Sequence, residues 1–194
     1  MESAYDAGSS QYRFEMQGGR LLLPFKGCPE FSLMSGTAQF NHASRRVNVP
    51  SCRLTTAAGG YLDIKGDWDG SSSSWTANMV VNGVPASSVL EDHWKKHVQG
   101  SVSGGIDLRG GRDGVTHVAG LARLQGGMLT GLPVLDRLAL FCGSSRFRNL
   151  PLHEASAQFT YQESAWHISN ILVESENLVR VDCLLYTSDA ADDT

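Results

Sequence analysis

The sequence is poor in charges, aromatic residues and cysteines for its length of 194 residues. Charged residues make up 19% and aromatic residues 8% of the chain, and it contains 4 cysteines and 6 prolines. The net charge of −4 provides no basic surface of the kind that nucleic acids need, so no nucleic-acid partner is expected. Hydrophobic residues at 41% are enough to bury a core, which excludes disorder of the whole chain.

Long hydrophobic runs are also missing. No apolar stretch approaches the roughly 20 residues that a membrane-spanning helix needs, and the best candidate, 129–142, is interrupted by Asp136 and Arg137. Residues 1–20 lack the basic and then apolar pattern of a signal peptide, so no leader is expected here. The 194 residues are predicted to be one domain or a piece of one.

Motifs for catalysis, phosphate binding and metal binding are weak or missing. The sequence has no Gly-x-Ser-x-Gly elbow and no Gly-Lys-Ser/Thr loop, which are the usual signals for serine hydrolases and phosphate binding. His93 and His97 have i, i+4 spacing, and 63–70 faintly resembles a calcium loop. A solvated surface is the favoured interpretation of both, because the metalloprotease Glu and the bidentate calcium Glu are absent. We therefore expect no enzyme activity, no cofactor and no metal.

Cys183 lies in the terminal segment 183–194, which is expected to be a non-native tail. The other three cysteines form neither a metal motif nor an even disulfide set. Cys52 and Cys142 lie among apolar neighbours and are expected to be small buried hydrophobic residues. A bridge between Cys28 and Cys52 stays open, because spacing gives no distance between them.

The dominant pattern that is present is an alternation of apolar and polar residues, typical of strands with one buried face. The clearest runs are 61–68, 102–109 and 155–162. Apolar residues change parity across Pro50, where a proline fits an edge or a β-bulge better than a central position of the sheet. They change parity again near Ser169-Asn170, which predicts a β-bulge there. Glycine is abundant, at 21 of 194 residues. Turn signals rich in Gly, Asn and Asp separate the runs at short intervals, which predicts an antiparallel meander. They are Gly59-Gly60, 69–74, Asn82-Gly83, 110–114 and Gly126-Gly127. Asn82-Gly83 could make a tight turn, but the favoured interpretation is that it leads into a helix.

Two segments depart from the alternation and are predicted to be helices. The first begins at Pro85 and ends at His97, with acidic residues before basic ones, as the helix dipole favours. The second is 132–142, with Pro133 in its first turn and Gly143 as its cap. A weak similarity between 60–68 and 104–112 indicates repeated strands in an elongated sheet. The predicted fold is therefore mainly β: an elongated, curved antiparallel meander sheet with an apolar concave face and one or two short helices.

The two ends of the sequence do not fit this pattern. Residues 183–194, Cys-Leu-Leu-Tyr-Thr-Ser-Asp-Ala-Ala-Asp-Asp-Thr, closely resemble a translated sequencing adapter, so we expect a non-native tail on a fragment taken from an assembled read. An acidic disordered tail is the alternative. Residues 1–29 are expected to hold partial upstream strands, and 30–182 to form the main β-region.

Three stretches carry a resemblance to a known family. They are 31–40 followed by 46–49, then 98–110, and then Gly127 to Leu138 leading through 147–152 and 155–161 to 168–181. Over roughly 30–182, this order of elements resembles the AsmA-like C-terminal region of bacterial envelope proteins, which belongs to the bridge-like lipid-transfer superfamily. The family's amino-terminal membrane helix and early repeats are absent from the sequence.

The resemblance implies an open sheet that binds lipid in a hydrophobic groove. It implies a periplasmic location at the inner membrane, a parent protein anchored there by a helix absent from this sequence, and a part in outer-membrane biogenesis. Phospholipid acyl chains are the expected partners, with outer-membrane or periplasmic proteins as further candidates. The predicted groove residues are Leu62, Ile64, Trp68, Val102, Ile106, Leu108, Phe159, Tyr161, Trp166 and Ile168. Arg146 and Arg148 are candidate contacts for lipid phosphates, although solvated strand charges are the favoured interpretation.

The alternative hypothesis is a structural or adhesive β-sandwich that binds a carbohydrate or a protein. A sugar-binding sheet would place Trp68, Trp75 and Trp166 on a shared polar face. The sequence argues against this, because Trp68 has the same parity as Leu62 and Ile64.

Overall fold

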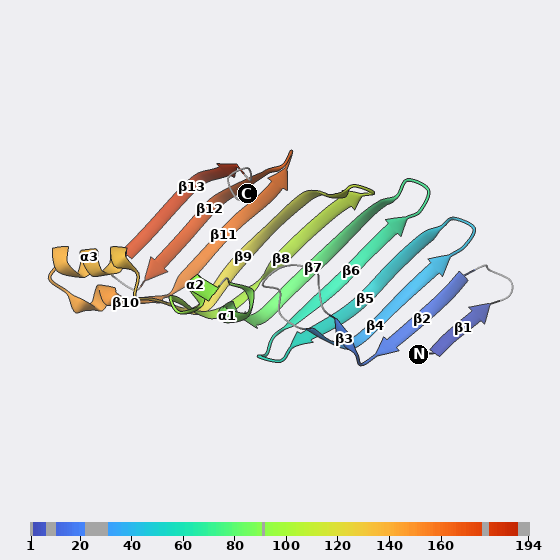
Figure 1. The fold of residues 1–194 in the computed structure, drawn as a ribbon, viewed down its shortest axis with the longest axis horizontal. Coiled ribbons are helices and arrows are strands. Elements are labelled where there is room, and N and C mark those ends of the chain that lie inside the picture. The colour runs from blue at the N-terminus through green and yellow to red at the C-terminus, as the bar shows by residue number, and fades with distance from the viewer. Residues whose placement is uncertain (1, 7–10, 22–30, 91, 176–178, 190–194) are drawn as a thin grey trace.

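The structure is a computed structural model and describes residues 2–6, 11–21, 31–90, 92–175 and 179–189. Its strands form a single antiparallel sheet in the order β1-β2-β4-β5-β6-β7-β8-β9-β11-β12-β13, with β3 and β10 paired on β4 and β9. β1 and β13 lie at opposite edges, so the sheet is open (Figure 1). The strands are β1 (Glu2–Asp6), β2 (Gln11–Gln17), β3 (Arg20–Leu21), β4 (Phe31–Asn41), β5 (Arg46–Thr56), β6 (Tyr61–Asp69), β7 (Ser74–Pro85), β8 (Val98–Gly111), β9 (Gly114–Thr130), β10 (Asn149–Leu152), β11 (Glu154–Gln162), β12 (Ala165–Ser175) and β13 (Val179–Asp189).

The predicted meander is confirmed. Successive strands are neighbours because short turns join them, and turns occupy the predicted positions at 57–60, 70–73 and 112–113. Asn82-Gly83 and Gly126-Gly127 are different: they lie inside β7 and β9, where Gly83 and Gly126 have φ of 62° and 58°. Both pairs are bulges and not turns, because the partner strand continues past them with one residue fewer.

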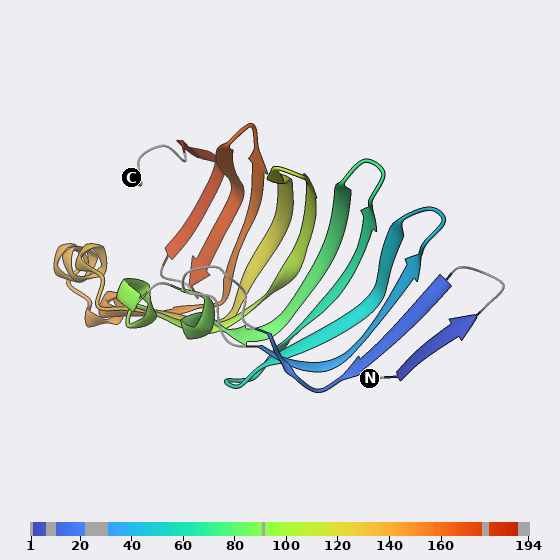
Figure 2. The same cartoon turned by 45° about the vertical axis from the view of Figure 1, so that its right-hand side comes forward.

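Bulges bend the long strands. Of the two alternatives at Pro50, an edge position or a bulge, the structure has the bulge, because the register jumps from Val49 to Cys52 against β6. The predicted bulge near Asn170 is confirmed, since Asn170 has a φ of 50° and the β11–β12 register shifts beside it. A bulge bends its strand locally, and the strands of this sheet arch in a common direction (Figure 2).

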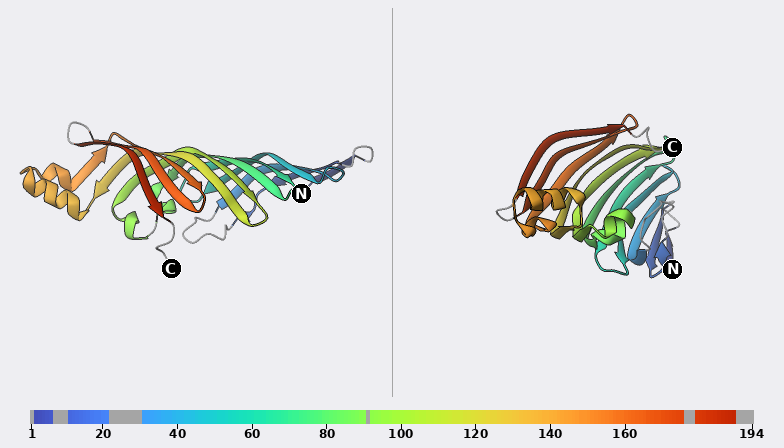
Figure 3. Two further views of the ribbon diagram at one scale, coloured as in Figure 1. Left: turned by 90° about the horizontal axis from the view of Figure 1, so that it is seen from above. Right: turned by 60° about the vertical axis from the view of Figure 1, so that its left-hand side comes forward.

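The segment predicted as one helix between Pro85 and His97 is instead two single turns, α1 (Ala86–Val89) and α2 (Asp92–Lys95). Leu90 ends α1 with extended dihedral angles, φ −88° and ψ 151°. The connection joins two neighbouring antiparallel strands, β7 and β8, so it has to reverse direction within a short distance. α1 lies on the concave side of the sheet, where Ala86 is buried (Figure 3).

The second predicted helix is confirmed as α3 (Pro133–Phe141). Pro133 begins it, and Gly143 ends it with a φ of 62°. The Ser144 amide donates to the Ala139 carbonyl at 3.0 Å and the Gly143 amide to the Leu140 carbonyl at 3.4 Å, which is a Schellman motif. A 3₁₀ turn, η1 (Ser145–Arg148), returns the chain to β10, so that α3 and η1 extend beyond the end of β9 (Figure 1).

The buried apolar residues gather in two clusters at the end of the sheet that holds α1 and α3. One is built on Phe31, Leu54, Leu62 and Val84. The other joins Leu135 of α3 to Leu150 and Leu152 of β10, as expected for a helix that packs near the end of the sheet. Among the residues that the structure describes, α1 and α3 therefore pack over one end of the apolar face.

Two predictions about cysteines change with the structure. Cys142 is exposed and not buried as predicted: it is the C-cap residue of α3, after the last helical turn. Cys52 is a half-buried free thiol that packs against the cluster of Phe31, Leu54, Leu62 and Val84. Cys28 lies outside the described residues. The adapter assignment of 183–194 stays a prediction: 183–189 form the end of β13, and 190–194 lie outside the described residues.

Candidate functional site

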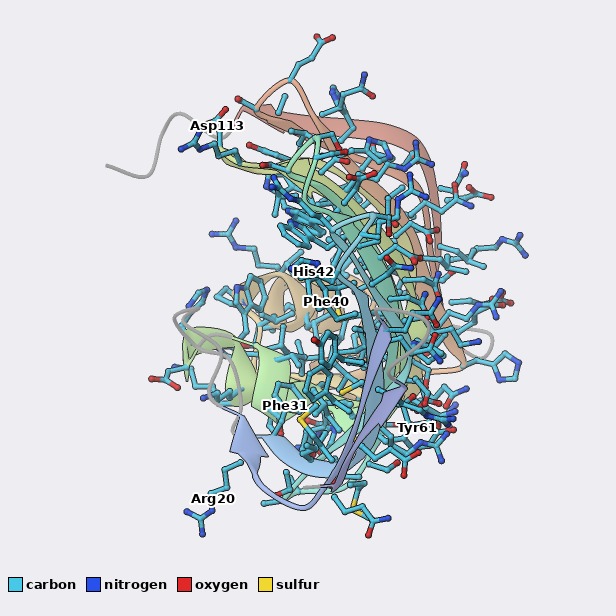
Figure 4. The ribbon with its side chains drawn as sticks, turned by 90° about the vertical axis from the view of Figure 1, so that its right-hand side faces the viewer. Arg20, Phe31, Phe40, His42, Tyr61 and Asp113 are labelled. Atoms are coloured by element: carbon cyan, nitrogen blue, oxygen red, sulfur yellow. The ribbon has the colours of Figure 1, made fainter. Side chains whose placement is uncertain are left out.

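Side chains sort to two chemically different faces of the sheet. Figure 4 looks along the sheet and shows the strands as an arc, with Phe31 and Phe40 inside it and Tyr61 outside. The sorting follows from the alternation, because neighbouring residues of a strand point to opposite faces and paired residues of adjacent strands point to the same face. The apolar face is the inside of the arc.

The register places all ten predicted groove residues on this inner face. Two rows of paired residues cross the sheet from strand to strand. One row consists of Leu108, Val118, Tyr161 and Trp166, and the other of Ile64, Met79, Ile106, Gly120, Phe159 and Ile168. Trp68 is paired with Trp75, Leu62 with Val81, and Val102 with Val84 and Leu124. We call these rows together the apolar trough. None of its described positions carries Asp, Glu, Lys or Arg.

Most of the trough is uncovered. Of the ten predicted residues only Leu62 is buried; Trp68 is 40% exposed, Trp166 is exposed as well, and the others are half-buried. The chain has an accessible surface of 13051 Å², whereas a compact protein of 21.0 kDa has about 9,000 Å². A sheet that leaves an apolar face open accounts for such an excess.

Glycines keep space open in the trough. A Cβ on Gly110 would lie 2.4 Å from the Trp75 ring, and one on Gly120 would lie 2.5 Å from the Phe159 ring. Each ring therefore lies over the glycine of the neighbouring strand and does not stand upright from the sheet. This cross-strand packing of an aromatic ring on glycine stabilises the pair and leaves the space above it free.

Several trough residues were missed by the sequence analysis. Trp75, Met79 and Val81 of β7 and Val118 and Leu124 of β9 lie beside the predicted ones. The signal was available, because the alternate residues 75, 77, 79 and 81 are apolar or small. Among the predicted residues, Tyr161 and Trp166 are in ring contact, with centroids 5.1 Å apart.

The outer face carries pairs of polar side chains that cross from strand to strand. Arg53 donates two hydrogen bonds of 2.6 Å to Asp63, and Asn48 donates one of 2.8 Å to Asp67. The hydrogen bond from Arg53 lowers the pKa of Asp63, and the same bond raises the pKa of Arg53. On the inner face, burial raises the pKa of the Cys52 thiol, and the Asp63 charge adds to this. The polar pairs of β5 and β6 thus lie on the outer face, and the described rows of the trough carry no Asp, Glu, Lys or Arg.

The two weak metal candidates do not assemble. Asp63, Asp67 and Asp69 are bound to Arg53, Asn48 and Arg46. His97 follows the end of α2 and its Nδ1 lies 2.8 Å from the Thr130 carbonyl, so it does not share a helix face with His93 as its spacing suggested. Within the described ranges, no three His, Cys, Asp or Glu side chains are close enough to hold a metal ion.

Hollows of moderate size on the outer face have charged and polar side chains in their lining. One of about 420 Å³ lies over β6, β7 and β8, lined by Lys65, Asp67, Thr76, Asn78, Asp107 and Arg109 among others. Asn78 donates a 2.8 Å hydrogen bond to Asp107 there, and Asp67 is bonded to Asn48, so the two carboxylates of the hollow are engaged within the protein.

The described helices are too short or too polar to cross a lipid bilayer. Comparisons of this chain with protein-family models, with curated proteins and with solved structures find no match. The function is therefore argued from the trough.

Proposed function

We propose that this chain is a non-enzymatic lipid-handling module that holds phospholipid acyl chains on its apolar trough. The observation that carries the proposal is a continuous, uncharged and uncovered apolar face that crosses the open sheet. An open sheet has to cover its apolar face, and among the described helices α1 and α3 pack at one end of it. Acyl chains are a suitable cover for the remainder, since they bring no polar atoms to a face that offers no polar partners.

The dimensions of the trough suit this occupant. The row from Cys52 through Ile64 to Ile168 crosses seven strands, which at about 4.8 Å between strands is about 29 Å. The hydrocarbon core of a bilayer, two acyl layers thick, is about 30 Å. One tail therefore needs about half of the row. Each buried methylene contributes about 0.8 kcal/mol, so a tail binds without any specific polar contact.

The resemblance of 30–182 to the AsmA-like region adds a biological setting to the proposal. In that setting the chain is part of an envelope protein on the periplasmic side of the inner membrane, anchored by a helix outside this sequence. Phospholipid then moves along the trough toward the outer membrane, and outer-membrane or periplasmic proteins are the further partners. Low specificity suits such transport, because a transfer groove has to release its cargo.

The carbohydrate- or protein-binding sandwich is not retained as a second proposal. A sandwich needs two facing sheets, and the described strands form one. Trp68, Trp75 and Trp166 lie in the apolar trough and not on a polar face.

A photocrosslinking amino acid at position 106 or 159 tests the proposal. Both positions are in the trough, whereas Asp107 and Thr160 beside them point to the outer face. In bacterial cells we expect crosslinked phospholipid at Ile106 and Phe159, and little or none at Asp107 and Thr160. Equal labelling on both faces would contradict the proposal. So would absence of lipid at Ile106 when a known lipid-transfer protein is labelled in parallel.

A further inference from the structure

The helical hairpin formed by α3 and η1 carries an unusual exposed apolar stripe. Phe141 is 90% exposed and Leu140 is 75% exposed, and Val134 is exposed as well. Val134, Arg137 and Phe141 share one helix face through their i, i+3, i+7 spacing, with Leu140 at its border. Large apolar side chains with this degree of exposure, grouped on one face, mark a surface that contacts something else.

Packing on the opposite side of α3 holds the exposed stripe in place. Leu135 and Ala139 on the opposite side of α3 are buried, and Leu135 packs on Leu150 and Leu152 of β10. The Schellman motif at Gly143 fixes the end of the helix. The exposed side chains are therefore presented by a packed helix and do not result from fraying of its end.

The charge around the stripe is positive, although the whole chain is negative. Residues 131–148 contain three arginines, Arg137, Arg146 and Arg148, and one acid, Asp136. Arg148 lies 3.5 Å from Asp136, while Arg137 and Arg146 are exposed and have no ion pair within the described part of the chain. Apolar side chains flanked by arginines suit an anionic lipid surface, which combines negative headgroups with an apolar layer beneath them.

The position of the hairpin allows a flat surface to reach it. α3 and η1 extend past the ends of the strands at one corner of the sheet (Figure 2), so neither β9 nor β11 stands in the way. We propose that this hairpin docks on the surface of a bilayer that contains anionic phospholipid, with Phe141 and Leu140 inserted between headgroups and Arg137 and Arg146 beside the phosphates. This site is separate from the trough and does not depend on what the trough binds.

Co-sedimentation of the whole chain with vesicles tests the proposal. We use vesicles of phosphatidylethanolamine and phosphatidylglycerol in equal parts, and vesicles of phosphatidylcholine for comparison. The expected result is preferential binding to the anionic vesicles, weakened several-fold when NaCl is raised from about 0.1 M to about 0.5 M. Leu140→Ser with Phe141→Ser should reduce the partition coefficient at least about tenfold, and Arg137→Gln and Arg146→Gln should reduce it about fivefold each.

Matched control variants distinguish binding through the hairpin from nonspecific binding of the chain to vesicles. Val80 is an exposed valine on the outer face, and Arg109 is an exposed arginine there, so Val80→Ser and Arg109→Gln should bind vesicles as the unmodified chain does. Lipid crosslinking at Ile106 should persist in the Leu140/Phe141 variant, which distinguishes failure of the hairpin from failure of the trough.

Three results would overturn the docking proposal. The first is unchanged vesicle binding by the Leu140/Phe141 variant. The second is loss of binding in Ile106→Asp while the hairpin variants still bind, which would assign the vesicle contact to the trough. The third is a self-association in sedimentation equilibrium that the hairpin variants abolish, which would make the stripe a contact between copies of this chain.

Discussion

Single glycines determine how deep the trough is. Trp75 and Phe159 can lie over the sheet because Gly110 and Gly120 opposite them have no side chain. A larger residue at either place would raise the ring and narrow the space for a ligand. The sequence shows that glycine is abundant. Whether an aromatic ring packs on a given glycine depends on which residue of the next strand is paired with it.

Gly120→Ala should destabilise the protein by about 1–3 kcal/mol, the usual cost of overpacking. The new Cβ would lie 2.5 Å from Phe159 and 2.8 Å from the Gly105 carbonyl oxygen, and the second of these is backbone that cannot rotate away. Urea unfolding measures the change. Gly105→Ala is the control: its Cβ would meet nothing within 4 Å, so a small stabilisation of up to about 1 kcal/mol is expected. Equal effects of the two substitutions would contradict this explanation.

The turn after β6 contains a carboxylate that resists protonation. Hydrogen bonds from the Ser71 hydroxyl and amide, assisted by Arg46, lower the pKa of Asp69 to about 2. Because the folded pKa is below the unfolded one, the stabilisation is present above about pH 4 and is lost as the pH falls through about 2. Ser71→Ala should move the pKa of Asp69 back toward its ordinary value, as measured by carboxyl ¹³C shifts during an acid titration. Ser72→Ala should leave it unchanged, and an unmoved pKa in Ser71→Ala would contradict the assignment.

At the scale of elements, local signals predicted those parts of the chain whose structure depends on local sequence. Pro133 and Gly143 define the two ends of α3, and the changes of parity at Pro50 and Asn170 are real bulges. The predictions that failed concern segments whose conformation depends on pairing with a neighbouring strand. Gly126 has the backbone of a turn residue, but the paired strand continues past it and makes it a bulge. Gly83 lies in a bulge as well, shortly before α1 begins at Ala86, as expected for a pair that leads into a helix. The segment 85–97 is divided because it has to connect two adjacent strands.

Leu135 should be the residue that attaches α3 to the sheet. It is 4% exposed and packs with Leu150 and Leu152, so Leu135→Ala should cost about 2–5 kcal/mol by leaving a cavity. Leu140→Ala on the exposed side of the same helix should change the stability by less than about 0.5 kcal/mol. Thermal unfolding followed by circular dichroism compares the two. A similar loss in both variants would mean that α3 is not attached through its Leu135 side.

At the scale of the whole molecule, an open sheet with an uncovered apolar face should be stabilised by whatever covers it. A lysophospholipid at about 100 times its dissociation constant should add about 2.7 kcal/mol, which corresponds to an increase in Tm of about 5–10 °C for a chain of this size. Ile106→Asp should lose most of this increase, because a carboxylate in the trough has no partner there. Asp107→Ser on the outer face of the same strand should retain it. An equal increase in all three proteins would contradict binding in the trough.

The sequence by itself determined the period of two, the spacing of the turns and therefore an antiparallel meander. It also determined which residues share a face within each strand, since side-chain direction alternates with backbone geometry alone. Only the tertiary structure decided that the ten predicted residues line up across strands, because register depends on pairing between distant segments and on bulges that shift it. The weak repeat and the family resemblance predicted an elongated, open sheet, and the structure confirms it. The same local alternation serves an open sheet, a sandwich and a barrel equally well, and the choice among them depends on contacts between residues far apart in the chain.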